Sequence, residues 1–230
     1  MIKLLLFDID GTLVSTGGAG GRAMAHAARE LFQINDAVGS ISMAGRTDAW
    51  IVGQMATSCQ VPYSREMLER FREIYLPHLA REIDAPGPQK GVCPGIRPVL
   101  HALAARRDAH LALLTGNFEE GARIKLEYFD LWQFFSSGAF GDSTDDRNSL
   151  LGVALDRVRA LGGPTVSPAE TVIIGDTPLD VAVALAGGAR SLAVATGGYT
   201  VEELKASGAD VVLNDLSDVQ AALRGMGLAG

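Results

Sequence analysis

The 230-residue sequence predicts an α/β fold, in which a parallel sheet with helices on both faces is interrupted by an all-helical insertion. Two observations lead to this prediction. From Cys93 onward, short apolar runs alternate with segments of helical periodicity, as the strands and helices of a parallel sheet do. Between Gly17 and Pro86, by contrast, the apolar residues recur at helical spacing and no convincing strand is found.

The chain opens with a predicted strand. Residues 2–7 are apolar apart from Lys3, and the run has the length of a buried strand. A loop of small residues follows at 15–21. Its spacing matches neither a Walker pattern nor a dinucleotide fingerprint, so we interpret it as a flexible lead-in to a helix. Thr47 and Ser64 are suitable N-caps for later helices. The helices expected in this part of the chain are 22–34, 47–58 and 64–83.

Glycine and proline mark the limits of this helical block. Pro77 should kink or end its third helix. The glycine-rich loop before the block and a Pro-Gly-Pro stretch after it have the composition of linkers. We therefore predict an α/β core formed by residues 1–15 and 92–230, and an inserted helical cap formed by residues 16–91. Because open α/β sheets bind ligands at the carboxyl ends of their strands, an insertion after the first strand would cover that site as a lid.

The second half of the chain supplies the remaining elements of the core. Helices are predicted at 96–107, 118–129, 147–161, 181–186 and 201–205, with a further helix at the C-terminus. Strands are predicted at 111–115, 134–140, 171–175, 191–195 and 211–213. The alternation of the two sets gives parallel strands joined by helices that cover both faces of the sheet.

Composition excludes several classes of protein. Hydrophobic residues make up 47% of the chain, which predicts a substantial core and excludes a disordered chain. A formal net charge of −7 argues against broad nucleic-acid binding, which requires a basic surface. No apolar run approaches membrane-spanning length and no signal peptide is recognisable, so we expect a soluble cytoplasmic protein without a membrane partner. The expected oligomeric state is a monomer or a homodimer. Cys59 and Cys93 form no CxxC pair and are interpreted as two small buried side chains.

Two acidic residues follow the first strand. Asp8 and Asp10 lie two residues apart at the strand end, before Gly11, and can converge on one site. Carboxylates this close repel each other and resist desolvation, and a divalent cation would relieve both problems. An Asp-Gly turn that closes the strand explains the same residues without a site. This stretch alone leaves the choice open.

Two more strand ends carry polar residues of the same kind. Thr115, Gly116 and Asn117 follow one strand, and Asp176 follows another, with Asp180 one helical turn further on. Helix capping explains each group separately, but three such groups at equivalent strand ends predict one shared site. Its carboxylates would hold Mg²⁺, a hard cation that prefers oxygen ligands. The amides of Gly116 and Asn117 at a helix start would bind phosphate oxygens.

Arg147 is a fourth candidate for the site. It lies near the start of a predicted helix, where the helix dipole disfavours a cation. One interpretation is an exposed arginine paired with Asp145 or Asp146. The other is a guanidinium directed at the site, where it holds the nucleophile and the phosphate together. The local sequence supports both equally.

In their order along the chain, these groups resemble the four motifs of the haloacid dehalogenase-like (HAD) phosphohydrolase superfamily: residues 8–12, residues 115–117, Arg147, and Gly175 and Asp176 with Asp180. The resemblance covers essentially the whole chain, and the helical insertion resembles the small cap of the phosphoglycolate phosphatase and β-phosphoglucomutase subgroup. It implies a Rossmann-like core and Mg²⁺-dependent hydrolysis of a small phosphate monoester through an aspartyl-phosphate. Arg147 departs from the commoner lysine of the family but keeps the positive charge.

The resemblance also implies a role for each site residue. Asp8 would be the nucleophile, and Asp10 would protonate the leaving alkoxide and then activate the attacking water. Thr115 would donate a hydrogen bond to the phosphate, and Arg147 would hold the nucleophile and the phosphate together. The metal ligands would be Asp8, Asp10 through its backbone carbonyl, Asp176 and Asp180.

Asp10 is the most informative residue for the reaction. The resemblance implies that dehalogenases and phosphonatases lack this second acid, so its presence favours cleavage of a C–O–P ester. A phosphomutase of the β-phosphoglucomutase type shares Asp10 and is the alternative, but it is expected to carry a histidine shortly after the first motif, and the nearest here is His26. A non-catalytic binding or regulatory protein on this fold would be expected to lack Asp8, Asp10 or Asp176, which are all present.

The cap is expected to select the substrate. Residues 44–48 form a loop that enters a helix and resembles the substrate-contact loop of the family's cap. Arg46 could reach a second anionic group of the substrate; the alternative is a solvated loop arginine. Arg22 and Lys90 are weaker candidates for the same role, because residues of this kind are more often surface charges. Aromatic residues are too sparse for a nucleobase pocket, so the expected partner is a small phosphorylated metabolite such as phosphoglycolate or a sugar phosphate.

Overall fold

The structure, a computed structural model, describes residues 2–33, 41–142 and 144–228. Within these ranges the main sheet has six strands, all parallel, in the order β5-β4-β1-β6-β7-β8. The strands are β1 (Leu4–Phe7), β4 (His110–Leu114), β5 (Gly138–Ala139), β6 (Thr171–Gly175), β7 (Arg190–Val194) and β8 (Val211–Leu213). The predicted α/β fold with a parallel sheet is therefore confirmed.

Strand β1 lies at the centre of the sheet and is fully buried. It pairs with β4 on one side and with β6 on the other. Leu5 and Phe7 pack into the apolar cluster on one face of the sheet, and Leu4 and Leu6 pack into the cluster on the opposite face. A strand that is covered on both faces needs a continuous apolar run, which explains the composition of the first strand.

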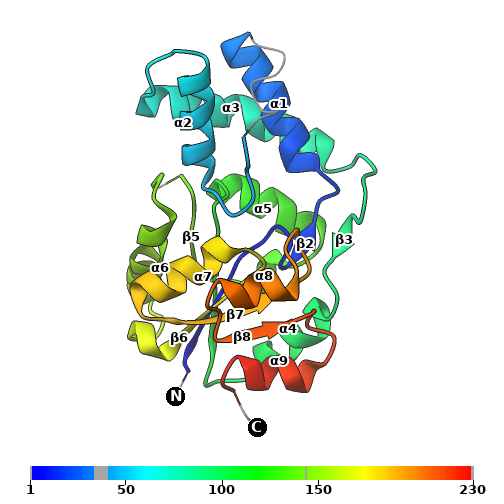
Figure 1. The fold of residues 1–230 in the computed structure, drawn as a ribbon, viewed down its shortest axis with the longest axis vertical. Helices are drawn as coiled ribbons and strands as arrows, with labels where there is room; N and C mark the ends of the chain where they lie inside the picture. The colour runs from blue at the N-terminus through cyan, green and yellow to red at the C-terminus, as the bar shows by residue number, and fades with distance from the viewer. Residues whose placement is uncertain (1, 34–40, 143, 229–230) are drawn as a thin grey trace.

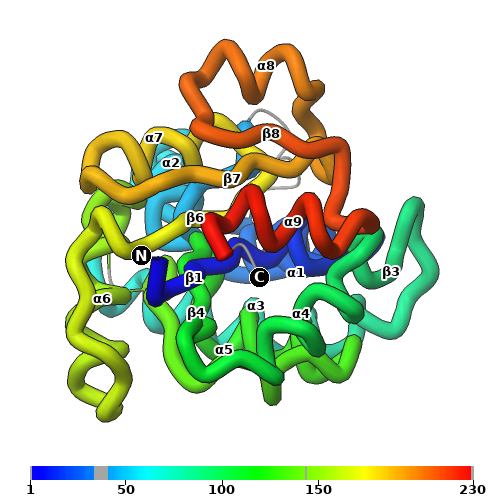
Figure 2. The backbone as a smooth tube through the Cα atoms, turned by 90° about the horizontal axis from the view of Figure 1, so that it is seen from below, coloured from blue at the N-terminus to red at the C-terminus, as the bar shows by residue number. Residues whose placement is uncertain are grey.

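Helices cover both faces of this sheet. Helices α4, α5 and α9 pack on one face, and helices α6 and α7 pack on the other. In Figure 2, α4 and α6 lie on opposite sides of β1 and β4. The helices of the core are α4 (Ile96–Ala104), α5 (Glu119–Tyr128), α6 (Leu150–Ala160), α7 (Pro178–Gly187), α8 (Val201–Ala206) and α9 (Val219–Gly225).

Three of the helices between β1 and β4 form a separate group, which we call the cap helices: α1 (Ala19–Phe32), α2 (Asp48–Ser58) and α3 (Arg65–Glu82). They share an apolar cluster of their own, which includes Met24, Met55, Phe71 and Tyr75. Figure 1 shows the cap helices together at the opposite end of the molecule from α4 and α9. The exact division into a core of residues 1–15 and 92–230 and a cap of residues 16–91 stays a prediction.

A short ribbon connects the cap helices to the core. Strand β2 (Val14–Ser15) pairs antiparallel with β3 (Gly91–Val92), so Val14 lies opposite Val92 and Ser15 lies opposite Gly91. The chain therefore enters and leaves the cap helices at one place. Strands of two residues carry no periodicity, which is why the sequence did not predict the ribbon.

The third cap helix does not end at Pro77. Helix α3 continues through the proline to Glu82. Proline removes one backbone hydrogen bond from a helix interior. Tyr75 and Leu79, on either side of the proline, are fully buried in the apolar cluster of the cap helices, and this packing holds the helix together.

Two predicted elements of the core are shorter than expected. The segment predicted as a strand at 134–140 begins at the last residue of the 3₁₀ turn Trp132–Phe134, and only Gly138–Ala139 pair with β4. The helix predicted at 147–161 begins as the 3₁₀ turn Arg147–Ser149 before α6 starts. The 3₁₀ turns and the two-residue strand are each too short for periodicity to distinguish them from a longer regular element.

Two further expectations concern the burial of the cysteines and the absence of a membrane-spanning helix. Both cysteines are free thiols, but only Cys93 is buried as expected, whereas Cys59 is half-buried. Within 2–33, 41–142 and 144–228, none of the helices combines the length and the apolar character that crossing a membrane requires. The expected monomeric or homodimeric state stays a prediction.

Phe118 links the sheet to the cap helices. It lies between β4 and α5, yet its buried side chain belongs to the apolar cluster of the cap helices. Its ring centroid is 5.9 Å from that of Tyr75 in α3. An apolar side chain of the core thus anchors the cap helices in the arrangement of Figure 1.

We expect Phe118→Ala to lower the free energy of unfolding by about 3 kcal/mol, because it empties a buried aromatic site. It should also raise amide hydrogen exchange in the cap helices more than in β1 and β6, since the apolar link between them is lost. Phe135→Ala is the matched control: Phe135 is buried beside the sheet, with its ring centroid 5.8 Å from that of Phe7. Equal changes of exchange in the two variants would contradict the linking role of Phe118.

Candidate active site

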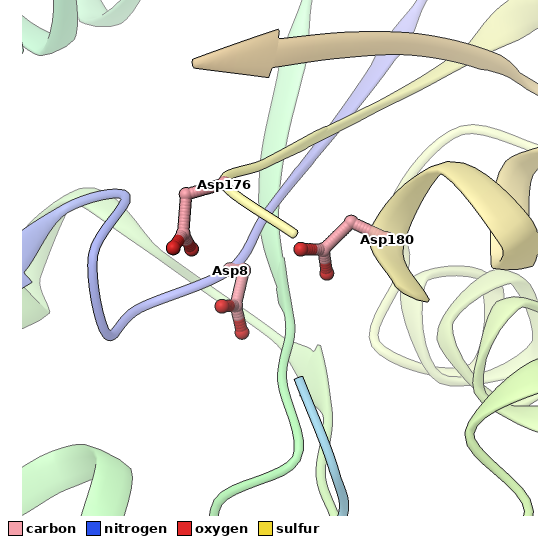
Figure 3. A group of neighbouring side chains, drawn as sticks. All are labelled: Asp8, Asp176 and Asp180. Atoms are coloured by element: carbon pink, nitrogen blue, oxygen red, sulfur yellow. The ribbon is translucent and has the colours of Figure 1, made fainter. Parts of the chain in front are cut away.

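Three carboxylates meet at the carboxyl ends of neighbouring strands. Asp8 follows β1 and Asp176 follows β6, and these two strands are hydrogen-bonded to each other. Asp180 lies in the first turn of α7. All three are buried, and one carboxylate oxygen from each lies within 4.8 Å of the others. Figure 3 shows the carboxylates gathered around one space. Together these side chains, here called the carboxylate cluster, could hold a metal ion.

The like charges of the carboxylate cluster are costly to bury. Burial raises the pKa of Asp8 to about 7, against the attraction of the Arg147 guanidinium, and the charges of Asp180 and Asp10 add to the rise. The pKa of Asp176 is raised well above its usual value, first by burial and then by Asp180 and Asp8. A bound cation would stabilise the ionised forms of these groups. A donor set made of carboxylate oxygens fits a hard divalent ion such as Mg²⁺.

Arg147 pairs with two members of the carboxylate cluster. Its Nη2 lies 3.3 Å from Asp8 Oδ1 and also contacts Asp180 Oδ1, and the side chain is buried. The ion pairs of the described residues include none between Arg147 and Asp145 or Asp146. Asp146 instead accepts a backbone hydrogen bond and caps the turn that carries the arginine. The guanidinium is therefore directed at the carboxylate cluster.

Two threonines hold the carboxylates in place. Thr12 Oγ1 donates to Asp176 Oδ1 at 3.1 Å. Thr177 donates to Asp180 Oδ2 from its backbone N–H at 3.0 Å and from its hydroxyl at 2.7 Å. The N–H of Asp180 donates back to Thr177 Oγ1, so the two residues form a capping box at the start of α7, and Thr177, not Asp176, is the N-cap of the helix. Asp176 is thereby left for the carboxylate cluster.

Gly11 lets the chain turn directly after β1. Its φ of +80° lies in the left-handed region, and a Cβ at this position would lie 2.4 Å from Asp176 Oδ2. Glycine satisfies both requirements. The Asp-Gly turn considered from the sequence is thus present, and its glycine lies directly against the Asp176 carboxylate.

Asp10 belongs to a second polar group. Its Oδ2 accepts hydrogen bonds from Asn117 Nδ2 at 2.9 Å and from Lys125 Nζ at 2.6 Å. Asn117 Nδ2 also donates to Thr115 Oγ1 at 2.8 Å, and Lys125 Nζ donates to Asn117 Oδ1 at 2.6 Å. The structure therefore brings the predicted residues Asp10, Thr115 and Asn117 together, and it adds a lysine from α5.

The N-terminus of α2 rests on the loops that follow β4 and β5. The N–H of Asp48 donates to the carbonyl of Gly116 at 2.7 Å, and the N–H of Ala49 donates to the carbonyl of Gly141 at 3.3 Å. Asp48 Oδ2 accepts from the N–H of Phe118 at 2.7 Å. Because α5 has no side-chain N-cap from its own segment, a cap helix supplies this acceptor.

A cavity of about 340 Å³ lies between the cap helices and the strand ends. Apolar and aromatic side chains line its cap side: Met24, Met43, Ile51 and Tyr75. The predicted site residues that line it are Asp8, Asp10, Arg46, Thr115, Gly116, Asn117, Arg147 and Asp176. Asp180 is not one of the lining residues, although it belongs to the carboxylate cluster.

The three basic residues considered for substrate binding differ in their surroundings. Arg46 lines the cavity, and its guanidinium stacks over the ring of Trp50 at 4.4 Å. Arg22 and Lys90 do not line the cavity. Arg22 pairs with Glu82 at 2.5 Å, and Lys90 donates to the hydroxyl of Tyr128 at 2.8 Å. Of the three, Arg46 alone keeps the predicted location at the site.

Lys125 and Asp48 are site residues that the sequence analysis did not single out. A signal existed for Lys125, because it interrupts the buried stripe of α5 between Ala122 and Leu126. Asp48 follows the N-cap Thr47 and has the usual explanation of an acidic residue in a first helical turn. Their partners are 115 and 70 residues away along the chain, so local patterns could not reveal them.

Comparison with known proteins identifies the family. A sequence model described as haloacid dehalogenase-like hydrolase matches residues 5–185, which include the carboxylate cluster, Arg147 and the cap helices. The chain belongs to the haloacid dehalogenase-like hydrolase family. The family predicted from the four motifs is therefore confirmed.

Relatives in this family are similar over nearly the whole chain. The probable phosphatase IndB of Dickeya dadantii strain 3937 is 29% identical over 231 residues, which cover 96% of this chain and 94% of that protein. A phosphoglycolate phosphatase of Chromobacterium violaceum is 28% identical over 230 residues, which cover 95% of each chain. A crystal structure of a hydrolase from Pseudomonas syringae covers 100% of both chains at 21% identity and has the same fold, with a TM-score of 0.72.

Asp48 makes the stability of the folded protein depend on pH. Burial raises the pKa of its carboxyl from 3.8 to about 7, although the Lys125 ammonium and the N–H of Phe118 oppose the rise. The folded protein therefore holds this proton more tightly than the unfolded chain does. The resulting loss of stability is absent below about pH 4 and complete above about pH 7.

The Asp48→Asn variant should therefore be more stable than the wild type at about pH 8, with a free energy of unfolding higher by about 2 kcal/mol. This difference should disappear toward about pH 4. The asparagine carbonyl still accepts a hydrogen bond from Phe118 but carries no charge to desolvate. Urea unfolding in the presence of a chelator measures the difference, with Asp84→Asn at an exposed carboxylate as the control. A gain for Asp48→Asn that is the same at every pH would contradict this explanation.

Proposed function

We propose that the protein hydrolyses a phosphate monoester of a small metabolite, with Mg²⁺ as its cofactor and an aspartyl-phosphate on Asp8 as its intermediate. The arrangement of Asp8 carries the proposal. It belongs to the carboxylate cluster, Arg147 contacts it, and it lines a cavity that Asp10 also lines. The names of the two relatives, a probable phosphatase and a phosphoglycolate phosphatase, support the same class of reaction.

The proposed reaction has two steps. In the first, a carboxylate oxygen of Asp8 bonds to phosphorus while the bond between phosphorus and the ester oxygen breaks. Asp10 gives its proton to that oxygen, which leaves as an alcohol. In the second, a water oxygen bonds to phosphorus, Asp10 takes a proton from the water, and the bond from Asp8 to phosphorus breaks. Ester and water become alcohol and phosphate, and both carboxyl groups return to their starting states.

Arg147 is suited to stabilise the phosphoryl group during both steps. Its Nη2 lies 3.3 Å from the Asp8 oxygen Oδ1, so its positive charge is next to the nucleophile. Its Nε is buried and has no hydrogen-bond partner among the residues that the structure describes. A phosphate oxygen is the kind of acceptor that such a group lacks.

The carboxylate cluster fits the proposed cofactor. Asp8, Asp176 and the backbone carbonyl of Asp10 would hold Mg²⁺, with Asp180 in support directly or through water. The ion would supply positive charge that neutralises the phosphate oxygens. Thr12 and Thr177 keep two of the carboxylates oriented through the hydrogen bonds described above.

The leaving group of the substrate would occupy the cap side of the cavity. We propose phosphoglycolate or a sugar phosphate, and the name of the Chromobacterium violaceum relative supports the first. Arg46 is the candidate for a second anionic group, because it is a basic residue of the cap region that lines the cavity. The phosphomutase alternative has less support, since His26 stacks on His78 with ring centroids 5.0 Å apart and does not line the cavity.

With Mg²⁺, the wild type should release inorganic phosphate from at least one of phosphoglycolate, a hexose phosphate, glycerol phosphate and para-nitrophenyl phosphate. Asp8→Asn should lower kcat by about 1,000-fold or more, because an amide cannot take up the phosphoryl group. Asp84→Asn, at an exposed position, should keep the wild-type rate. Undiminished release by Asp8→Asn would exclude the covalent route, and no release from any ester by the wild type would exclude the phosphatase.

Mg²⁺ should also raise the midpoint of thermal unfolding of the wild type, because it binds the folded state and relieves the repulsion within the carboxylate cluster. The stabilisation is about 2.7 kcal/mol at a concentration one hundred times the Kd. Asp176→Asn should lose most of this shift, since it removes one ligand and one charge. Sodium chloride at matched ionic strength controls for screening. A full shift in Asp176→Asn would contradict the proposed ligand set.

A further inference from the structure

Lys125 is a buried lysine whose ammonium group contacts side chains of the site. Its side chain is 4% exposed, and its Nζ lies 2.6 Å from Asp10 Oδ2 and 2.6 Å from Asn117 Oδ1. A buried ammonium group is costly unless it is paired. Ala122 and Leu126 continue the buried stripe of α5 on either side, so an apolar residue would suit the packing of this position. The lysine is therefore explained by its polar partners and not by the helix.

Lys125 holds one carboxyl oxygen of Asp10, Oδ2, by a hydrogen bond that does not involve the other oxygen, Oδ1. Asp10 Oδ2 accepts from Lys125 Nζ and from Asn117 Nδ2, which holds the carboxyl group from two directions. No hydrogen bond to Asp10 Oδ1 is found in the described part of the chain. The Asp10 side chain is 44% exposed and lines the cavity, so it has room to take several rotamers without these contacts. The two hydrogen bonds to Oδ2 select one of these Asp10 rotamers.

The network also holds Asn117 itself. Lys125 accepts no hydrogen bond and therefore fixes the Asn117 side chain with its carbonyl toward the ammonium and its Nδ2 toward Asp10 and Thr115. Lys125 thus reaches Asp10 twice, directly and through Asn117. The ends of β1 and β4 are joined by this network at the side chains that follow them.

We propose that Lys125 is a positioning residue that holds the Asp10 carboxyl group in the orientation required for both proton transfers. This proposal rests on the function proposed above. Lys125 neither gives nor takes a proton in either step. It holds Oδ2 of Asp10, so that Oδ1 is the oxygen that meets the leaving alkoxide and then the attacking water.

Lys125→Met tests the proposal, because methionine keeps much of the length of the side chain and removes the charge and the donors. Single-turnover rates should be compared for two esters: the alkyl phosphate that the wild type cleaves fastest, and para-nitrophenyl phosphate, whose leaving group departs without a proton. General acid catalysis contributes about 100-fold or more. We expect a loss of about 100-fold for the alkyl ester, a loss of less than about 10-fold for the nitrophenyl ester, and KM changed by less than about 3-fold.

A double-mutant cycle isolates the action through Asp10. In an Asp10→Asn background the reacting carboxyl group is absent, so Lys125→Met should reduce the rate by less than about 3-fold further. Lys205→Met, at an exposed lysine of α8, is the matched control and should behave as the wild type. Asn117→Ala removes the other donor to Asp10 Oδ2 and should show the same preference for the nitrophenyl ester. If thermal unfolding shows that Lys125→Met does not fold, Asn117→Ala takes its place as the test variant.

The outcomes distinguish the proposal from its alternatives. Equal losses for both esters, or a full further loss in the Asp10→Asn background, would overturn the positioning role. A raised KM with unchanged kcat would also overturn it, because Lys125 would then bind the substrate itself. A wild type that cleaves no ester would overturn the proposed phosphatase and this inference with it. An active wild type with an unaffected Lys125→Met variant would overturn the inference alone.

Discussion

The confinement of like charges at the ends of β1 and β6 is the constraint on which the rest of the site depends. A central strand that is buried on both faces fixes Asp8, and its hydrogen-bonded neighbour fixes Asp176. These carboxylates cannot separate without disrupting the sheet. The surrounding structure compensates for the fixed charge: a buried arginine contacts two members of the cluster, and threonine donors satisfy individual carboxylate oxygens.

Two basic residues that line the cavity, Arg147 and Lys125, pair with different carboxylates. Arg147, in the turn before α6, contacts Asp8 and Asp180, whereas Lys125 in α5 contacts Asp10. Helices α5 and α6 pack on opposite faces of the sheet, so each layer of helices supplies one positive charge. Asp8 and Asp10 therefore have distinct surroundings although they are two residues apart. Two carboxyl groups in different environments can take different roles, as a nucleophile and an acid must.

The features that could be predicted from the sequence are those with a local pattern. The apolar run of β1, the alternation of strands and helices, and the acidic residues at strand ends are all local, and together they were sufficient for the family. The two-residue strands of the ribbon have too few residues for a periodicity. Lys125 was missed for another reason: its one local sign is that it interrupts the apolar stripe of α5, and its partner Asp10 comes close only when the sheet has formed.

Strands β2 and β3 make the cap helices exchangeable as a unit. Because the two crossings of the chain pair with each other, the ends of the intervening segment lie side by side. A segment of another length or composition could join the same two ends, and the register of β1 with β4 and β6 would not need to change. Evolution could therefore change the specificity of such a protein by replacing the segment between β2 and β3, while the residues at the ends of the core strands stay the same.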